Sequence, residues 1–159
     1  MEQFAVDTTS MWKNRPLGVS GLLRIKNDEE FIQACVDSCI DALDELIITY
    51  NDCTDNSEEV IDYVKNKYPN KIKVYKYLPH IQSSNLTEDE YNHLISIPEN
   101  STQLLSNYYN YALSKSSYKY VMKIDADQIY YTKSLVELCN AYRGGVDVNV
   151  SIKDCFSFL

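Results

Sequence analysis

The chain has 159 residues, of which 45% are hydrophobic and 24% are charged, and its net charge is −8 at pH 7. This length is typical of one domain with a core of its own. An acidic chain without a basic stripe cannot neutralise a phosphate backbone, so we expect no nucleic-acid partner. No apolar run reaches the roughly 18 residues of a membrane-spanning helix, so we expect peripheral membrane association at most.

Strands and helices are expected to alternate along the chain. The expected strands are residues 17–25, 46–50, 71–77 and 118–124. The expected helices are residues 28–43, 55–68, 101–113 and 132–142. This order predicts an α/β fold, with a mostly parallel sheet and helices on both faces. Residues 79–100 lack clear periodicity and are interpreted as a long functional loop.

Helix ends are indicated by a few polar residues and glycines. Asp55 with Glu58 three residues later predicts a capping box at the start of the second helix, and Ser101 is expected to cap the third. Gly144 and Gly145 are expected to end the last helix.

The cysteines are scattered and contain no C-x-x-C pair. They are Cys35, Cys39, Cys53, Cys139 and Cys155. The N-terminal segment has neither the basic nor the apolar region of a secretory signal, so we expect reduced thiols in a cytoplasmic protein, with the inner-membrane surface as the alternative location. Cys35 and Cys39 lie on the apolar face of a predicted helix and are expected to pack as small apolar groups.

The triplet Asp125-Ala126-Asp127 directly follows the fourth predicted strand. Two carboxylates at the carboxyl end of a buried strand suit a hard divalent cation, Mn²⁺ or Mg²⁺, that also holds a diphosphate. Polar clusters follow the first and second strands as well, which predicts a nucleotide-type site at one edge of the sheet. Neither G-x-G-x-x-G nor G-x-x-x-x-G-K-[ST] occurs, so we expect a metal rather than a glycine-rich loop to hold the phosphates.

Four short blocks resemble the nucleotide-sugar glycosyltransferases of the GT-A fold, of the family 2 type. They are most similar to the bacterial lipooligosaccharide β-1,4-N-acetylgalactosaminyltransferases. The resemblance covers roughly residues 16–135. The blocks are Arg24-Ile25-Lys26-Asn27, residues 50–55 with 57–59, residues 106–111, and residues 123–127 with Tyr130-Tyr131.

The resemblance implies a role for each matching residue. Asp127 would bind the metal directly, and Asp125 would contact the ribose or the metal's hydration shell. The base would be flanked by Arg24, Ile25, Lys26 and Asn27, while Asn51 or Asp52 would hydrogen-bond the uracil or the ribose.

The resemblance also implies the activity, which is metal-dependent transfer of a hexose or N-acetylhexosamine from a UDP-sugar with inversion. The acceptor would be a bacterial surface glycan or glycolipid, such as lipopolysaccharide, lipooligosaccharide or capsule. The family's acceptor pocket and catalytic base follow the D-x-D. We therefore expect an N-terminal extension (1–15), a nucleotide-sugar-binding domain (16–145) and a tail (146–159), with the acceptor half missing and the catalytic base unassigned. Gln128 stands where close relatives carry histidine.

Other interpretations stay open. The chain could be a truncated transferase that binds UDP without turnover, or another metal-dependent nucleotide enzyme such as a nucleotidyltransferase. Asn51 and Asp52 also suit a turn, and Arg24 and Lys26 could be ordinary surface charges. Three further sets are expected to be structural: Asn107 and Asn110 in solvent, His80 and His93 on the surface, and at least one of Tyr108, Tyr109 and Tyr111 in the core.

Overall fold

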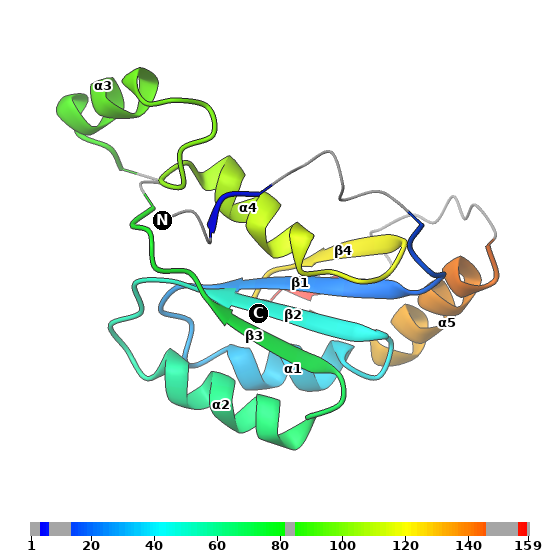
Figure 1. Cartoon of the computed structure of the whole chain (residues 1–159). Helices are drawn as coiled ribbons and strands as arrows, with labels where there is room; N and C mark the ends of the chain where they lie inside the picture. The colour runs from blue at the N-terminus through cyan, green and yellow to red at the C-terminus, as the bar shows by residue number, and fades with distance from the viewer. Residues whose placement is uncertain (1–3, 7–13, 82–84, 146–155, 159) are drawn as a thin grey trace.

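The chain forms an α/β structure, and the computed structural model describes residues 4–6, 14–81, 85–145 and 156–158. Its elements follow one another in a fixed order (Figure 1). They are β1 (Val19–Ile25), α1 (Ile32–Cys39), β2 (Glu45–Tyr50), α2 (Ser57–Lys67), β3 (Ile72–Lys76), α3 (Glu88–Ser96), α4 (Leu105–Ser114), β4 (Tyr120–Ile124), β5 (Gln128–Tyr130), α5 (Thr132–Arg143) and β6 (Phe156–Phe158).

The main sheet is parallel and has the strand order β3-β2-β1-β4. Helices α1 and α2 cover one face, where α1 also contacts α5, and α4 lies on the other face (Figure 1). A second, two-stranded sheet pairs β5 with β6 in antiparallel fashion. The predicted α/β fold with a mostly parallel sheet and helices on both faces is therefore confirmed. In the described residues, no helix is both long enough and apolar enough to cross a membrane.

The larger core lies between the sheet and α1, α2 and α5. Its centre is formed by fully buried residues of β1, β2 and α1, such as Leu23, Ile48 and Ile32. Cys35 and Cys39 are buried in this core as free thiols, which confirms the prediction that they pack as small apolar groups. Burial of this apolar surface is the main force that holds the helices on the sheet.

A smaller aromatic core lies on the α4 side of the sheet. The ring of Tyr77 lies 4.6 Å from that of Tyr108 and 5.0 Å from that of Tyr111, between ring centroids. Phe4 and Ile81 complete this buried cluster. The cluster fixes the orientation of α4, and it confirms that at least one tyrosine of the helix is a core residue.

Two predicted helix caps are wrong, and α1 (Ile32–Cys39) is shorter at both ends than the helix expected over residues 28–43. Asp55 and Glu58 form no capping box, because the Asp55 carboxylate accepts hydrogen bonds from the Ser57 and Glu29 backbone N–H groups. Glu58 instead pairs with Lys76 of β3 at 2.7 Å. Ser101 accepts from the Gln103 backbone N–H in a turn, and α4 begins only at Leu105. Asp55 and Glu58 thus bond partly to tertiary partners, whereas Ser101 bonds to a nearer residue than a cap would.

Residues 79–100 are not a continuous loop, because they contain α3. This helix begins with a capping box between Thr87 and Glu90, and it has no buried residue. It projects away from the sheet (Figure 1). The sequence carried two signals of this helix that the prediction did not use: the Thr87-x-x-Glu90 capping box, and the helical spacing of Tyr91, Leu94 and Ile95. Helix α5, by contrast, ends where expected, with Gly144 as its C-cap.

Candidate functional site

The polar segments predicted to form a site lie at one edge of the parallel sheet. β1 is hydrogen-bonded to β2 on one side and to β4 on the other, with Ile25 opposite Tyr50 and Leu23 opposite Ile124. Because parallel strands end at the same edge, the loops that follow β1, β2 and β4 are neighbours there. The structure therefore brings residues 24–28, 51–55 and 125–127 to a single edge.

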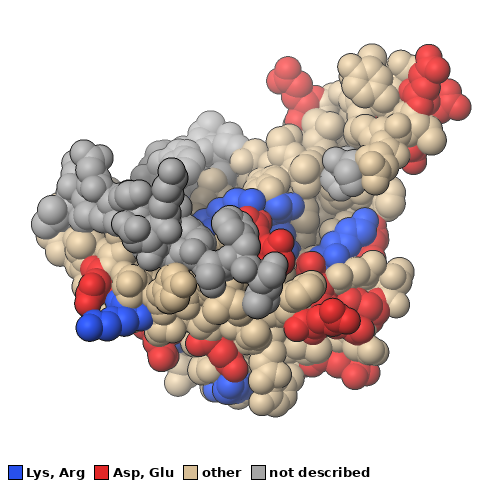
Figure 2. Space-filling view, turned by 180° about the vertical axis from the view of Figure 1, so that it is seen from behind, with Lys and Arg blue, Asp and Glu red and all other residues tan. Residues whose placement is uncertain are grey.

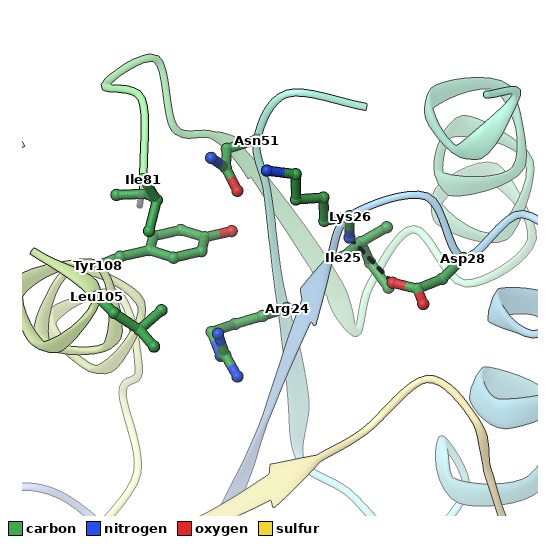
Figure 3. Close-up of a pocket in the computed structure, with 8 residues that line it drawn as sticks. All are labelled: Arg24, Ile25, Lys26, Asp28, Asn51, Ile81, Leu105 and Tyr108. Carbon is green, nitrogen blue, oxygen red and sulfur yellow. Dashed lines mark hydrogen bonds between the residues drawn. The ribbon is translucent and has the colours of Figure 1, made fainter. Parts of the chain in front are cut away.

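A cavity of about 160 Å³ opens at this edge between the ends of β1 and β2 and helix α4. Figure 3 shows side chains from all three elements directed toward it. Its lining residues are Arg24, Ile25, Lys26, Asp28, Asn51, Ile81, Leu105 and Tyr108. Of the predicted donor-binding residues, Arg24, Ile25, Lys26 and Asn51 line the cavity.

Asn51 is the most buried polar residue of this lining, with 3% of its surface exposed. Its backbone N–H donates to the Ile25 carbonyl at 3.4 Å, which continues the β1–β2 pairing by one step. Its side-chain amide donates weakly to the Asp52 carboxylate at 3.4 Å. The amide therefore has capacity left for a ligand in the cavity.

Asp52 and Asn27 shape the loops and do not line the cavity. Asp52 has a left-handed backbone (φ 47°), and its carboxylate lies 2.8 Å from Nδ1 of His80. Asn27 is also left-handed (φ 60°), and its side-chain oxygen accepts a hydrogen bond from the Thr54 backbone N–H at 2.7 Å. Both residue types adopt this conformation readily, so Asp52 forms the turn that was its alternative interpretation, and Asn27 forms a turn in the same way.

The D-x-D triplet directly follows β4. Ala126 is buried and anchors the triplet, Asp127 is exposed, and the Asp125 side chain is 38% exposed and paired with Lys123 at 2.7 Å. Cys35 of α1 donates its thiol hydrogen to the Asp125 backbone carbonyl at 3.4 Å. The triplet is thus fixed by its backbone and its alanine, while both carboxylates can reach solvent.

The pKa of Asp28, in the loop after β1, responds to the charge of Asp127, so the triplet lies close to this loop. Burial raises the pKa of the Asp28 carboxyl, and a hydrogen bond from the Lys26 backbone N–H lowers it. The negative charges of Asp55 and Asp127 raise the same pKa further. Carboxylates from three loops therefore repel one another across this edge, and a cation would relieve that repulsion.

The donor set at the triplet fits a divalent cation only in part. Across the described portion of the chain, no three His, Cys, Asp or Glu side chains are grouped so as to hold a metal ion. Mg²⁺ is commonly held by only one or two carboxylates together with water and substrate phosphates. Asp125 and Asp127 match that arrangement, in which a diphosphate supplies the remaining oxygen ligands.

Four lining residues were not predicted: Asp28, Ile81, Leu105 and Tyr108. Leu105 and Tyr108 lie three residues apart on α4, a spacing that places both on one helix face. That spacing was visible in the sequence, but the direction of the face was not. Asn107, in contrast, donates to the Glu99 and Ser101 backbone carbonyls, so its role is structural.

The charge around the site is mixed. In Figure 2 the basic side chains form small separate groups among acidic ones on the face shown. Acidic residues occupy the first turns of α2 and α3, where they complement the helix dipoles. Arg24 and Lys26 therefore provide local positive charge at the cavity within an acidic protein.

This parallel α/β fold, with an exposed D-x-D beside a cavity at the carboxyl edge of its sheet, is that of the GT-A glycosyltransferases. Residues 2–152 match the model of the beta-1,4-N-acetylgalactosaminyltransferase (CgtA) family. The chain belongs to this family. The resemblance found in the sequence is thereby confirmed. The chain matches no curated protein.

Several solved structures are similar in fold. S. aureus TarS 1-349 in complex with UDP has 16% identity and a TM-score of 0.50, over 77% of this chain and 31% of that one. A second S. aureus TarS structure has 16% identity and a TM-score of 0.51, over 77% of this chain and 19% of that one. Glucosyl-3-phosphoglycerate synthase from Mycobacterium tuberculosis has 19% identity and a TM-score of 0.43, over 76% of this chain and 36% of that one. The chain thus spans about a third or less of the two TarS structures.

Proposed function

We propose that this chain is the donor-binding part of a metal-dependent glycosyltransferase that takes a hexose or N-acetylhexosamine from a UDP-sugar. The observation that carries the proposal is the common location of the cavity and the D-x-D at one edge of the sheet. The family membership supports the reaction class. A bacterial surface glycan as acceptor, inversion at the anomeric carbon and a cytoplasmic location belong to the same proposal.

Asp127 and Asp125 would hold Mn²⁺ or Mg²⁺ in this proposal. When bound, the metal would act as a Lewis acid that neutralises the charge developing on the diphosphate leaving group. The exposed Asp127 carboxylate is free to bind directly, and Asp125 must first exchange its contact with Lys123. Lys123, once released, lies near enough to attract the same diphosphate by its charge.

Arg24, Lys26 and Asn51 would bind the nucleoside. The two cations at the cavity attract an anionic donor, and the buried amide of Asn51 offers both a donor and an acceptor for hydrogen bonds. The apolar side chains of Ile25, Ile81 and Leu105 exclude water around a flat ring. These roles orient the donor and leave the acceptor and its general base to other residues of the enzyme.

The domain division expected from the sequence is part of the same proposal. Residues 16–145 would form the donor-binding domain, and they contain both the cavity and the triplet. Most of the expected extension (1–15) and tail (146–159) lies outside the described residues.

Calorimetric titration of UDP into the chain, with Mn²⁺ and then with EDTA, tests the proposal. We expect binding that depends on Mn²⁺. Asp127→Asn should weaken it by at least about tenfold, since loss of even a supporting contact at a metal site commonly costs this much. Asp41→Asn changes an exposed carboxylate that follows α1, away from the site, and should have no effect.

Two outcomes would count against the proposal. Equal UDP affinity in the Asp127→Asn variant would remove the triplet from the metal site. A clear preference for a nucleoside triphosphate over UDP would favour a nucleotidyltransferase instead.

A further inference from the structure

We propose that the hydroxyl group of Tyr108 recognises the nucleobase of the donor by donating a hydrogen bond to the O4 carbonyl oxygen of uracil. Tyr108 belongs to α4 and lines the cavity with Asn51 and Arg24. This inference rests on the proposed function, because it assigns the occupant of the cavity to the uridine part of the donor. It adds a determinant of base specificity that lies outside the loops after β1, β2 and β4.

The ring of Tyr108 is held in one position. Only 3% of the residue is exposed, and its ring packs 4.6 Å from the ring of Tyr77, between centroids. Figure 3 shows the ring extending from α4 with its hydroxyl directed toward the end of β1. The hydroxyl therefore cannot turn away to find a partner in solvent.

This hydroxyl is not satisfied by the protein. Among the described residues, the hydroxyl oxygens of Thr49 and Tyr108 are the buried side-chain polar atoms that lack a hydrogen-bond partner. A weak hydrogen bond with the Thr49 hydroxyl lowers the pKa of Tyr108, but the pair falls outside normal hydrogen-bond geometry, so neither hydroxyl is fully satisfied. A buried unpaired hydroxyl costs stability and calls for an explanation, and a ligand that completes its bonding provides one.

The surroundings of the Tyr108 hydroxyl favour a ligand group that accepts a hydrogen bond from it. Burial raises the pKa of Tyr108 to about 12, so the hydroxyl stays protonated at neutral pH and can donate. The guanidinium carbon of Arg24 lies 5.9 Å from the centre of the Tyr108 ring, and Lys26 also lines the cavity. Their positive charge favours a carbonyl oxygen over an amino group, and at position 4 uracil carries a carbonyl where cytosine carries an amino group.

A base can reach this hydroxyl past Lys26, an exposed residue of the lining with a long, rotatable side chain. The rest of the lining is preformed by Ile25, Ile81 and Leu105, and Arg24 is held against the ring of Tyr109. Rotation of the Lys26 side chain would admit a flat ring without a change in the backbone.

Titration of UDP and of CDP in the presence of Mn²⁺, with wild-type protein and Tyr108→Phe, tests the inference. We expect the variant to bind UDP about three- to tenfold more weakly, the range for one lost hydrogen bond. The preference of the wild-type protein for UDP over CDP should shrink in the variant. The melting temperature of the free variant should be equal to or higher than that of the wild type, because an unpaired buried hydroxyl is removed.

Tyr111→Phe is the matched control. Tyr111 is also a buried tyrosine of α4, but it does not line the cavity. Removal of its hydroxyl group should therefore leave the UDP affinity unchanged. Unchanged UDP affinity in Tyr108→Phe, or equal wild-type affinity for UDP and CDP, would overturn the inference and leave the proposed function intact. Failure of the wild-type protein to bind UDP at all would overturn both.

Discussion

The guanidinium group of Arg24 lies over the ring of Tyr109, with its central carbon 3.6 Å from the ring centroid. The same group donates a hydrogen bond to the Tyr109 hydroxyl. Arg24 lies near the end of β1 and Tyr109 on α4, so the pair connects two elements that form the walls of the cavity. A cation held against an aromatic face keeps its charge while it loses freedom of motion. The contact with Tyr109 therefore fixes the position of the positively charged Arg24 guanidinium group at the cavity.

Replacement of Tyr109 by alanine should weaken UDP binding. Without the ring, Arg24 becomes mobile, and the binding energy must then cover the cost of ordering it. We expect a loss of about three- to tenfold in UDP affinity, measured by calorimetry with Mn²⁺, in keeping with the size of a partly exposed cation–π contact. Tyr109→Phe keeps the aromatic face and should lose much less; an equal loss in both variants would show that the hydroxyl, not the ring, positions Arg24.

Replacement of Lys123 by methionine should tighten Mn²⁺ binding. Lys123 pairs with Asp125 at 2.7 Å, and its side chain is 56% exposed. Exposed ion pairs are worth at most about 1 kcal/mol, so we expect up to about fivefold higher Mn²⁺ affinity in the presence of saturating UDP. Lys119→Met removes an exposed positive charge just before β4, at the opposite end of that strand, and serves as the control. Weaker Mn²⁺ binding in Lys123→Met would mean that Lys123 acts on the diphosphate more than it competes with the metal.

The sequence was sufficient for the sheet, because buried parallel strands show themselves as apolar runs with polar residues after them. Strand β2 (Glu45–Tyr50) and helix α5 agree with their predictions within one residue. Strand β5 was missed because three residues are too few for a pattern. Helix α3 was missed although Tyr91, Leu94 and Ile95 have helical spacing after a Thr87-x-x-Glu90 capping box, because polar residues outnumber apolar ones in this short segment.

The candidate site could be predicted where it depends on chain order, but not where it depends on side-chain direction. Arg24, Lys26 and Asn51 line the cavity because they follow strands that end at the same edge. Asn27 and Asp52 follow the same strands, yet left-handed backbones turn them toward Thr54 and His80. The contribution of Tyr108 depends on how α4 packs over the sheet, which no local pattern determines.

Replacement of Glu45 by glutamine should destabilise the protein. Glu45 is 3% exposed, and its carboxylate accepts hydrogen bonds from Ser20, from Ser117 and from Lys73 at 2.6 Å. Loss of the charge weakens all of these bonds, and we expect about 1–3 kcal/mol lower stability in urea unfolding at pH 7. Glu58→Gln breaks an exposed pair with Lys76 and should cost less than about 0.5 kcal/mol.

The same carboxylate should make stability depend on acid pH. Burial by itself raises the pKa of Glu45, but the hydrogen bonds from Lys73, Ser20 and Ser117 outweigh it and hold this pKa below the ordinary 4.5. A depressed pKa means that the stabilisation is complete above pH 4.5 and is lost as pH falls through the folded-state pKa. The stability difference between wild type and Glu45→Gln should therefore shrink below about pH 4.5. A difference that stays constant down to pH 3 would contradict this role of Glu45.

Replacement of Gly21 by alanine should destabilise the fold without touching the site. Gly21 lies in β1, and a Cβ atom there would stand 2.6 Å from Cδ1 of Leu43 and 2.8 Å from Cδ1 of Ile124. Both neighbours are buried, so they can move only by disturbing the core, and overpacking of this kind costs about 1–3 kcal/mol. Urea unfolding measures the loss, and UDP affinity under native conditions should be unchanged, since the cavity lies beyond the end of β1. At Gly144 an added Cβ would meet only two backbone oxygens, at 3.3 and 3.6 Å, so Gly144→Ala should cost less. Equal stability of Gly21→Ala and wild type would contradict the prediction, because it would show that Leu43 and Ile124 can move aside without cost.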